Sequence, residues 1–271
     1  MVRAKLPVLE SRPLINPEMV PQVGFLGGDE GKLVHEEIQR KYSQFFAINQ
    51  VSYRNNLAQG STPFYVVAVN EIIRLQGFRV ATLADLENIL KLNALDLTCH
   101  YEDSALVLRS EKDPNSYLAQ NLMKQIRVRN PEVKMPVMIP LAGLSLVQDS
   151  GSDYGLTFTL RGDAEMVYAE ILNSQNGSFS PEGMDASIGL PRKLGKGNMT
   201  LYTGKEGLSR LYLYRDSDLY SGGEGLAGLG GNGRVVVVDG KTTANNSEAY
   251  IPPQIEQELI ETGFIHAKKT I

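Results

Sequence analysis

A loop rich in glycine and positive charge runs from residue 189 to residue 198. Its sequence is Gly-Leu-Pro-Arg-Lys-Leu-Gly-Lys-Gly-Asn. Glycines let backbone N–H groups converge on an anion, and arginine and lysine add charge-assisted hydrogen bonds. We therefore expect Arg192, Lys193, Lys196 and Asn198 to bind a phosphate or a carboxylate. The alternative is a basic loop that only faces solvent.

A second group of polar residues is acidic and comprises Asp216, Asp218 and Glu224. Carboxylates at alternate positions of a tight loop are ligands of hard cations such as Ca²⁺. The EF-hand pattern fails here, because Tyr220 occupies its fifth position and the glycine falls one residue late. We therefore expect an acidic cluster at a hairpin end, and no metal. The glycine-rich stretch 225–233 is interpreted as either a mobile flap over a site or a solvated connection.

Residues 97–103 read Leu-Thr-Cys-His-Tyr-Glu-Asp. Adjacent residues of a strand point to opposite faces, so Cys99 and His100 are not expected to form a thiolate–imidazolium pair. We expect Cys99 to be a buried structural cysteine. The alternative is an acid–base cluster of His100, Glu102 and Asp103 at a strand edge.

Three tyrosines, Tyr212, Tyr214 and Tyr220, lie near Arg210 and Arg215 in the sequence. Aromatic rings next to arginines are able to stack the bases of a nucleic acid. Against this, 27 Lys and Arg residues face 31 Asp and Glu residues, which gives a net charge of −4. The total charge therefore argues against nucleic acid as a partner.

Helical patterns dominate between residues 29 and 130, and strand patterns follow. Four helices are predicted in this part. The first has an apolar stripe at Val34, Ile38 and Tyr42, and the second spans 63–76. The third begins with a capping box at Thr82, and the fourth spans 113–130. The predicted strands are 105–109, 135–139, 156–160, 166–170, 208–215 and 234–239, and a last helix spans 254–261. This order predicts an α+β fold, with a helical N-terminal half packed against a mainly antiparallel, β-rich C-terminal half and a C-terminal helix.

The first 24 residues contain Pro7, Pro13, Pro17 and Pro21. Proline removes backbone donors and fixes φ, so we expect residues 1–24 to form an extended arm. Apolar residues between the prolines predict that the arm docks, either on its own domain or on a second copy in a homo-oligomer. Residues 25–271 are interpreted as one α+β domain, with an internal boundary near 131 as the alternative.

Composition excludes several classes of protein. Hydrophobic residues make up 42% of the chain and charged residues 21%, which is ordinary globular usage and excludes global disorder. A single cysteine excludes an internal disulfide and any CxxC metal or redox motif. The longest apolar stretch, 136–148, is too short for a bilayer, and the N-terminal segment lacks the apolar core of a signal peptide. We expect a cytoplasmic protein without a membrane partner or a cofactor.

No motif of catalysis is complete in the chain. The glycine-rich turn 24–32 has leucines where a phosphate-binding loop needs glycine and serine or threonine, and His35-Glu36 lacks the second histidine of a zinc protease. The sequence therefore favours a non-enzymatic binding or assembly module. The first alternative is an enzyme or ligand-binding domain that takes a phosphorylated or carboxylated small molecule through loops 189–233. The second is a nucleic-acid-binding module.

Overall fold

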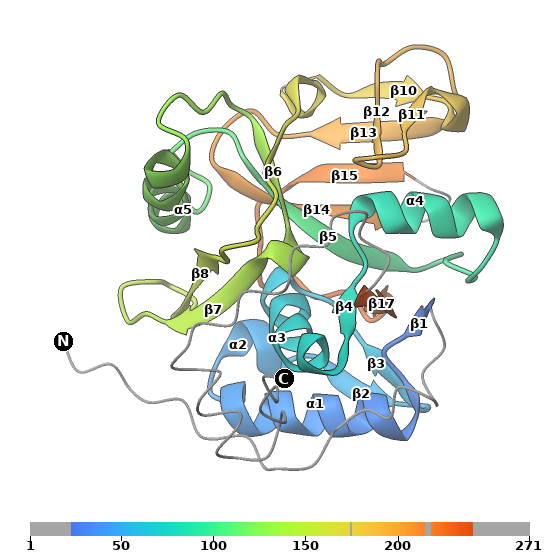
Figure 1. Cartoon of the computed structure of the whole chain (residues 1–271), viewed down its shortest axis with the longest axis vertical. Helices are drawn as coiled ribbons and strands as arrows, with labels where there is room; N and C mark the ends of the chain where they lie inside the picture. The colour runs from blue at the N-terminus through green and yellow to red at the C-terminus, as the bar shows by residue number, and fades with distance from the viewer. Residues whose placement is uncertain (1–22, 174, 215–217, 241–271) are drawn as a thin grey trace, which may run out of the picture.

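The computed structural model describes residues 23–173, 175–214 and 218–240, and its largest feature is a curled, eight-stranded sheet (Figure 1). Seven strands follow one another across this sheet, and β16 (Gly233–Arg234) pairs with β5 in addition. Their order is β10 (Gly177–Phe179), β13 (Met199–Thr203), β15 (Asp218–Gly223), β14 (Leu208–Tyr214), β5 (Tyr101–Leu108), β6 (Val137–Pro140) and β9 (Val167–Tyr168). Neighbours are antiparallel except for β13 with β15 and β16 with β5.

Smaller sheets surround the large one. A three-stranded sheet has the order β1 (Val23–Phe25), β17 (Val236–Asp239) and β4 (Phe78–Val80). Three two-stranded sheets are β2 (Ser52–Arg54) with β3 (Leu57–Gln59), β7 (Leu144–Gln148) with β8 (Leu156–Leu160), and β11 (Met184–Asp185) with β12 (Leu190–Pro191). Short 3₁₀ turns span Arg74–Gln76, Leu141–Gly143, Glu170–Leu172 and Pro181–Gly183.

Five α-helices lie in the first half of the described chain. They are α1 (Gly28–Tyr42), α2 (Phe46–Asn49), α3 (Pro63–Ile73), α4 (Leu83–Leu92) and α5 (Ser116–Arg129). The α3 helix is central, since ten of its eleven residues are buried. Its start is fixed locally, because the Thr62 hydroxyl accepts the Tyr65 N–H at 3.1 Å and Pro63 takes the first helical position. Gly77, at φ 85°, ends the 3₁₀ turn that follows it.

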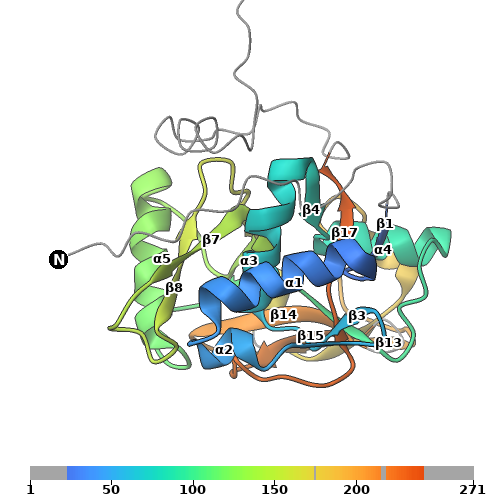
Figure 2. The ribbon, with the colours of Figure 1, turned by 90° about the horizontal axis from the view of Figure 1, so that it is seen from below.

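Both faces of β5 are buried, which makes it the centre of the molecule. Leu106 and Leu108 belong to the core that contains α3 and α5, while Ala105 and Val107 belong to the core that contains α4. Alternate residues of a strand point to opposite faces, so one strand serves both cores. α4 therefore covers one face of the large sheet, and α3 and α5 pack against part of the other. Figure 2 shows α5 beside the hairpin of β7 and β8, and α1 in front of α3.

The α+β class predicted from the sequence is confirmed. The arrangement of a helical N-terminal half against a β-rich C-terminal half is not confirmed, because β5 lies between β14 and β6, and β1 and β4 flank β17. Strands from both sides of residue 131 thus share one sheet. Residues 234–239, expected as one strand, are divided at Val235 between two sheets. The end of the expected arm, Val23 and Gly24, belongs to β1, whereas the rest of the arm and the helix 254–261 lie outside the described residues.

Within residues 23–173, 175–214 and 218–240, no helix is both long enough and apolar enough to cross a membrane.

Candidate functional site

Four tyrosines lie side by side on one face of the large sheet, and we call them the tyrosine row. They are Tyr202 of β13, Tyr220 of β15, and Tyr212 and Tyr214 of β14. Ring centroids are 5.4 Å apart for Tyr202 and Tyr220, 5.2 Å for Tyr220 and Tyr212, and 6.1 Å for Tyr212 and Tyr214. Tyr220 and Tyr212 are stacked, with 26° between their planes. The row continues to Tyr101 of β5, which is buried and 5.5 Å from Tyr212.

Strand alternation explains why these rings share a face. On β14, Leu211 and Leu213 enter the core that contains α4, so the tyrosines at positions 212 and 214 point the other way. The same alternation holds on β13 and β15, where Leu201 and Leu219 enter that core. Register then aligns the rings, because the residue pairs 202 with 220 and 212 with 220 lie directly opposite each other.

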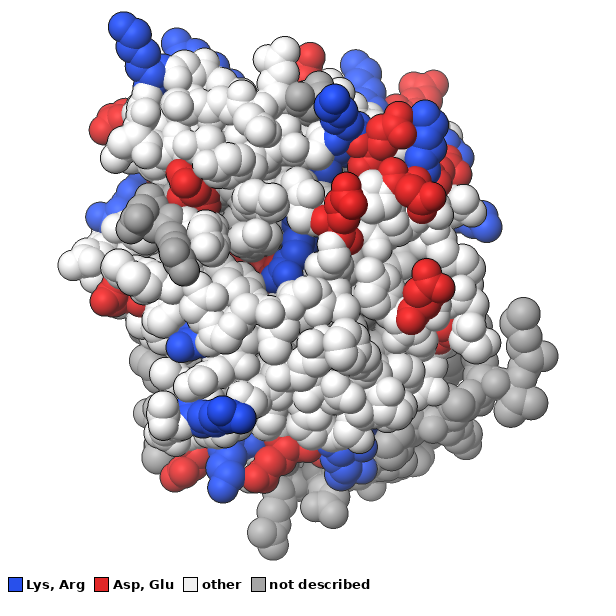
Figure 3. Space-filling model, turned by 180° about the vertical axis from the view of Figure 1, so that it is seen from behind, with Lys and Arg blue, Asp and Glu red and all other residues white. Residues whose placement is uncertain are grey.

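The tyrosine row lies on the side of the sheet opposite α4. Tyr202 is 36% exposed, and the other three rings are partly exposed. That side of the molecule carries mainly uncharged side chains, and a hollow near its centre shows Lys or Arg atoms at its floor (Figure 3).

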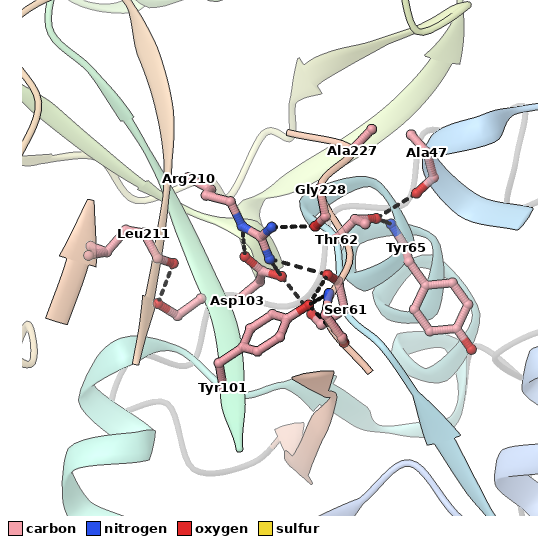
Figure 4. Close-up of polar contacts among 12 residues, drawn as sticks. Ala47, Ser61, Thr62, Tyr65, Tyr101, Asp103, Arg210, Leu211, Ala227 and Gly228 are labelled. Carbon is pink, nitrogen blue, oxygen red and sulfur yellow. Dashed lines mark hydrogen bonds and ion pairs between the residues drawn. The ribbon is translucent and has the colours of Figure 1, made fainter. Parts of the chain in front are cut away.

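A buried ion pair between Arg210 of β14 and Asp103 of β5 lies beside the row (Figure 4). Nε of Arg210 donates to Oδ1 of Asp103 at 2.7 Å, and Nη2 donates to Oδ2. Nη1 donates to the Gly228 carbonyl at 2.6 Å, and the Ser61 carbonyl accepts from Nη2 at 3.2 Å. The guanidinium carbon also lies 4.9 Å from the centre of the Tyr212 ring. Arg210 thus holds several elements together and contacts the row from the interior.

These contacts set the pKa values of Arg210 and Tyr212. Burial alone lowers the pKa of Arg210, but the Asp103 carboxylate outweighs burial and the pKa rises. Burial raises the pKa of Tyr212 to about 12, and the Arg210 cation opposes this rise only in part. The phenol therefore stays protonated at neutral pH, and the one charged pair beside it is internally compensated. The Tyr212 ring is therefore uncharged, although it lies next to a cation.

The glycine-rich stretch 225–233 is a partly buried connection between β15 and β16, and other elements anchor it. Leu226 is completely buried. The carbonyls of Glu224, Ala227 and Gly228 accept hydrogen bonds from Asn115, Gln50 and Arg210. Gly230 donates to the Tyr101 hydroxyl at 2.9 Å. Glycine is required for close packing at Gly233, because a Cβ there would lie 2.5 Å from the Ser61 nitrogen. The stretch is thus anchored to the core through Leu226 and Gly233, while Gly225, Gly228 and Gly231 are exposed.

The expected anion loop lies between β12 and β13. Arg192, Lys193, Lys196 and Asn198 are all exposed there. The backbone anchors the loop, since the Gly195 N–H donates to the Ser178 carbonyl of β10 at 2.7 Å. The structure therefore places these four side chains on one exposed loop at the β10 edge of the sheet.

The expected acidic cluster is not a single group in space. Asp218 opens β15 and accepts the Thr200 N–H at 2.5 Å, whereas Glu224 follows the other end of the strand. At about 3.3 Å per residue, roughly 20 Å of strand separates the two. Asp216 lies outside the described residues. In the described part of the chain, no three His, Cys, Asp or Glu side chains gather closely enough to hold a metal ion.

The start of β5 and the turn before it contain Cys99, His100, Glu102 and Asp103. Cys99 is exposed, so the expectation of a buried cysteine is wrong. It lies in a turn in which the His100 N–H donates to the Leu97 carbonyl, and in this turn Leu97 is the buried side chain. Glu102 is 1% exposed, and neither of its oxygens has a hydrogen-bond partner in the described structure. Arg234 of β16 lies opposite it in register. Asp103 bonds to Arg210 and Ser61, and within the described residues no hydrogen bond joins it to His100 or Glu102.

Glu102 gives the first testable prediction. Burial raises the pKa of Glu102 to about 8, Asp103 adds to the rise, and Arg234 opposes it. The ordinary pKa of glutamate is 4.5. Between pH 4.5 and pH 8, Glu102 keeps its proton in the folded protein and loses it in the unfolded chain, so its contribution to the free energy of unfolding falls as pH increases. We expect Glu102→Gln to become progressively more stable than the wild type over this range. Urea unfolding at pH 5 and pH 8 measures it, and an equal difference at both pH values contradicts it.

Comparison with known proteins adds no family to this geometry. No family model, no curated protein and no solved structure matches this chain. The functional assignment therefore depends on the residues themselves.

The sequence did not identify Tyr202 of the tyrosine row or Tyr101, to which the row continues. The alternation Met-Thr-Leu-Tyr-Thr at 199–203 was the available signal for Tyr202. This alternation gives the face on which Tyr202 lies, but its position beside Tyr220 depends on the pairing of β13 with β15.

Proposed function

We propose that this protein is a non-enzymatic binding module whose ligand lies on the tyrosine row. The observation that carries this proposal is the set of four adjacent, partly exposed rings on a sheet face that α4 does not cover. Solvent-accessible tyrosines combine a large apolar area with little side-chain entropy to lose, which suits them to binding.

The polar groups beside the row support binding rather than catalysis. A catalytic acid, base or nucleophile must reach the substrate with a free proton donor or acceptor. Arg210 already donates to Asp103, Gly228 and Ser61, and both Asp103 oxygens already accept hydrogen bonds. These side chains position the tyrosines and have little left to offer a substrate.

The enzyme alternative needs the basic loop and the carboxylates to converge in one pocket. Asp218 lies near the basic loop through Thr200, but Glu224 lies at the far end of β15. The geometry therefore supports the binding module better.

A prediction follows for the double variant Tyr202→Ala/Tyr220→Ala. The probes are a single-stranded oligothymidylate, maltohexaose, cellohexaose and a tyrosine-rich peptide, and binding is followed by tyrosine fluorescence and calorimetry. The chain has 12 tyrosines and no tryptophan, so fluorescence reports tyrosine directly. We expect at least one probe to bind, and the double variant to lose about tenfold or more in affinity, because each ring contact contributes roughly 0.5–1.5 kcal/mol.

The matched control is Tyr168→Ala on β9, at the opposite edge of the sheet. Tyr168 is 48% exposed, so its removal tests whether any surface tyrosine has the same effect. We expect affinity to be unchanged in this variant. If no probe binds at millimolar concentration, or if the double variant binds as tightly as the wild type, the tyrosine row is not a binding surface.

A further inference from the structure

Half of the buried polar atoms that lack a hydrogen-bond partner gather at one place in the described chain. Eight such side-chain atoms occur there, and four of them belong to three neighbouring residues. The four are both carboxyl oxygens of Glu102, Nε of Arg234 and Nδ1 of His100. Buried polar groups in proteins are nearly always hydrogen-bonded, so this cluster indicates that a polar group from outside these residues binds there.

Strand pairing brings the three residues together. Glu102 of β5 lies directly opposite Arg234 of β16, and residues paired in this way share one face of a sheet. His100 precedes Glu102 by two residues, and its ring lies edge to face with the ring of Phe25 on β1, at 5.5 Å between centroids. Burial lowers the pKa of His100, and the nearby Arg234 cation lowers it further. Glu102 also lies opposite Leu213, which belongs to the core that contains α4, so the cluster is on the side of the sheet opposite the tyrosine row.

Glu102 and Arg234 face each other without neutralising each other. No ion pair joins them within the described residues. Nη1 of Arg234 donates to the carbonyls of Gly231 and Gly233, at 3.1 and 2.7 Å, which holds the guanidinium in place. Nε has no acceptor among the described residues, so the edge formed by Nε and Nη2 remains for a ligand. The two parallel N–H groups of such an edge match the two oxygens of a carboxylate.

Glu102 offers a ligand a proton rather than a negative charge. Because burial raises its pKa to about 8, the side chain is a neutral carboxylic acid at pH 7. A carboxylic acid that is kept neutral by an apolar site donates a hydrogen bond to an oxyanion. Glu102 is 1% exposed, whereas Arg234 and His100 are half-buried. The cluster therefore extends from the surface inward to this proton.

We infer that Glu102 and Arg234, with His100 beside them, form a second binding site, which takes the carboxylate group of a small molecule. Nε and Nη2 of Arg234 donate to the two carboxylate oxygens, and the Glu102 carboxyl donates its proton to one of them. Arg234 is the cation of this cluster, and one carboxylate neutralises it, whereas a phosphate group carries close to two negative charges. The site is separate from the tyrosine row, so the inference does not depend on the proposed function.

The experiment measures the dissociation constants of acetate, lactate and succinate by ligand-observed NMR at constant ionic strength. Phosphate and chloride are the comparison ions, and lactate is included because its hydroxyl is able to donate to Nδ1 of His100. The melting temperature in millimolar carboxylate gives an independent readout, since a ligand of the folded state stabilises it. We expect at least one of the three carboxylates to bind and to raise the melting temperature.

Substitution of Arg234 tests the guanidinium. Arg234→Gln should weaken carboxylate binding about tenfold or more, because it removes two charge-assisted hydrogen bonds. Arg234→Lys keeps the charge but lacks the parallel N–H groups, so it should recover only part of the affinity. The matched control is Arg54→Gln, which should bind as the wild type does. Arg54 is exposed on β2 and forms no ion pair within the described residues.

The pH dependence tests Glu102 separately. The charged and titratable groups around it are Asp103, Arg234, His100, Tyr101 and Asp96. The pKa of His100 is lowered below 6.5, so His100 stays neutral from pH 7 to pH 9. The carboxylate binds the protonated form of Glu102, whose pKa is about 8, so the affinity of the wild type should fall about tenfold from pH 7 to pH 9. In Glu102→Gln an amide N–H donates instead, and the affinity should stay constant over this range.

Four results overturn the inference. If no carboxylate binds at millimolar concentration, water alone satisfies the cluster. If Arg234→Gln binds as tightly as the wild type, the carboxylate lies elsewhere. The same pH dependence in Glu102→Gln and in the wild type excludes the proton of Glu102, and tighter binding of phosphate than of every carboxylate excludes the ligand class. None of these results concerns the tyrosine row, whose own variants test the proposed function.

Discussion

Asp103→Ala is expected to lower the free energy of unfolding by about 3–5 kcal/mol. The side chains of Arg210 and Asp103 are 7% and 0% exposed, so the substitution leaves a guanidinium in the interior without its anion. The Ser61 hydroxyl, which donates to Asp103 at 2.7 Å, also loses its acceptor. Urea unfolding followed by far-ultraviolet circular dichroism measures the change.

The control for this prediction is Glu206→Ala. Glu206 pairs with Lys112, but the two side chains are 51% and 71% exposed, and such surface pairs contribute at most about 1 kcal/mol. A similar loss of stability in both variants would contradict the special role of the buried pair. Because Arg210 also bonds to Gly228 and contacts Tyr212, we expect Asp103→Ala to loosen the 225–233 loop and the tyrosine row together.

Val67→Asp is expected to have the largest effect on stability, a loss of more than about 4 kcal/mol. Val67 is completely buried in α3, and helix α3 is enclosed by the core on nearly all sides. A carboxylate at this position would be buried among apolar side chains of the core. Thermal unfolding by circular dichroism measures the loss, and an unchanged melting temperature would exclude the central position of the helix.

Two further variants keep this prediction testable if Val67→Asp does not fold. Val67→Thr buries only a hydroxyl and should cost about 1–3 kcal/mol, which is measurable. Val128→Asp makes the same chemical change on α5, where the valine is 85% exposed, and should have little effect.

Local interactions determined several elements that the sequence predicts well. The start of α3 follows from Thr62 and Pro63 and the stop after it from Gly77, all of which act within a few residues. The capping box of α4, between Thr82 and Asp85, is equally local. The stripe at Val34, Ile38 and Tyr42 gave the buried face of α1 correctly, because helical periodicity depends only on neighbours in the chain.

Pairing between distant segments decided the rest. Arg210 and Asp103 are separated by 107 residues, and nothing in either local sequence indicates the other. The glycine-rich stretch 225–233 has the composition of an open loop, yet Gln50 and Tyr101 anchor it to the body of the protein from far along the chain. Composition describes what a segment can do alone, whereas its burial depends on which partners fold against it.

The tyrosine row shows this division most clearly. Alternation within 208–214 already predicted that Leu211 and Leu213 would lie on one face and Tyr212 and Tyr214 on the other. The sequence by itself therefore determined which way each of these rings points. Only the tertiary structure placed Tyr220 and Tyr202 beside them and ended the row on β13, next to the edge strand β10, because strand order and register are set by contacts between residues remote in the chain.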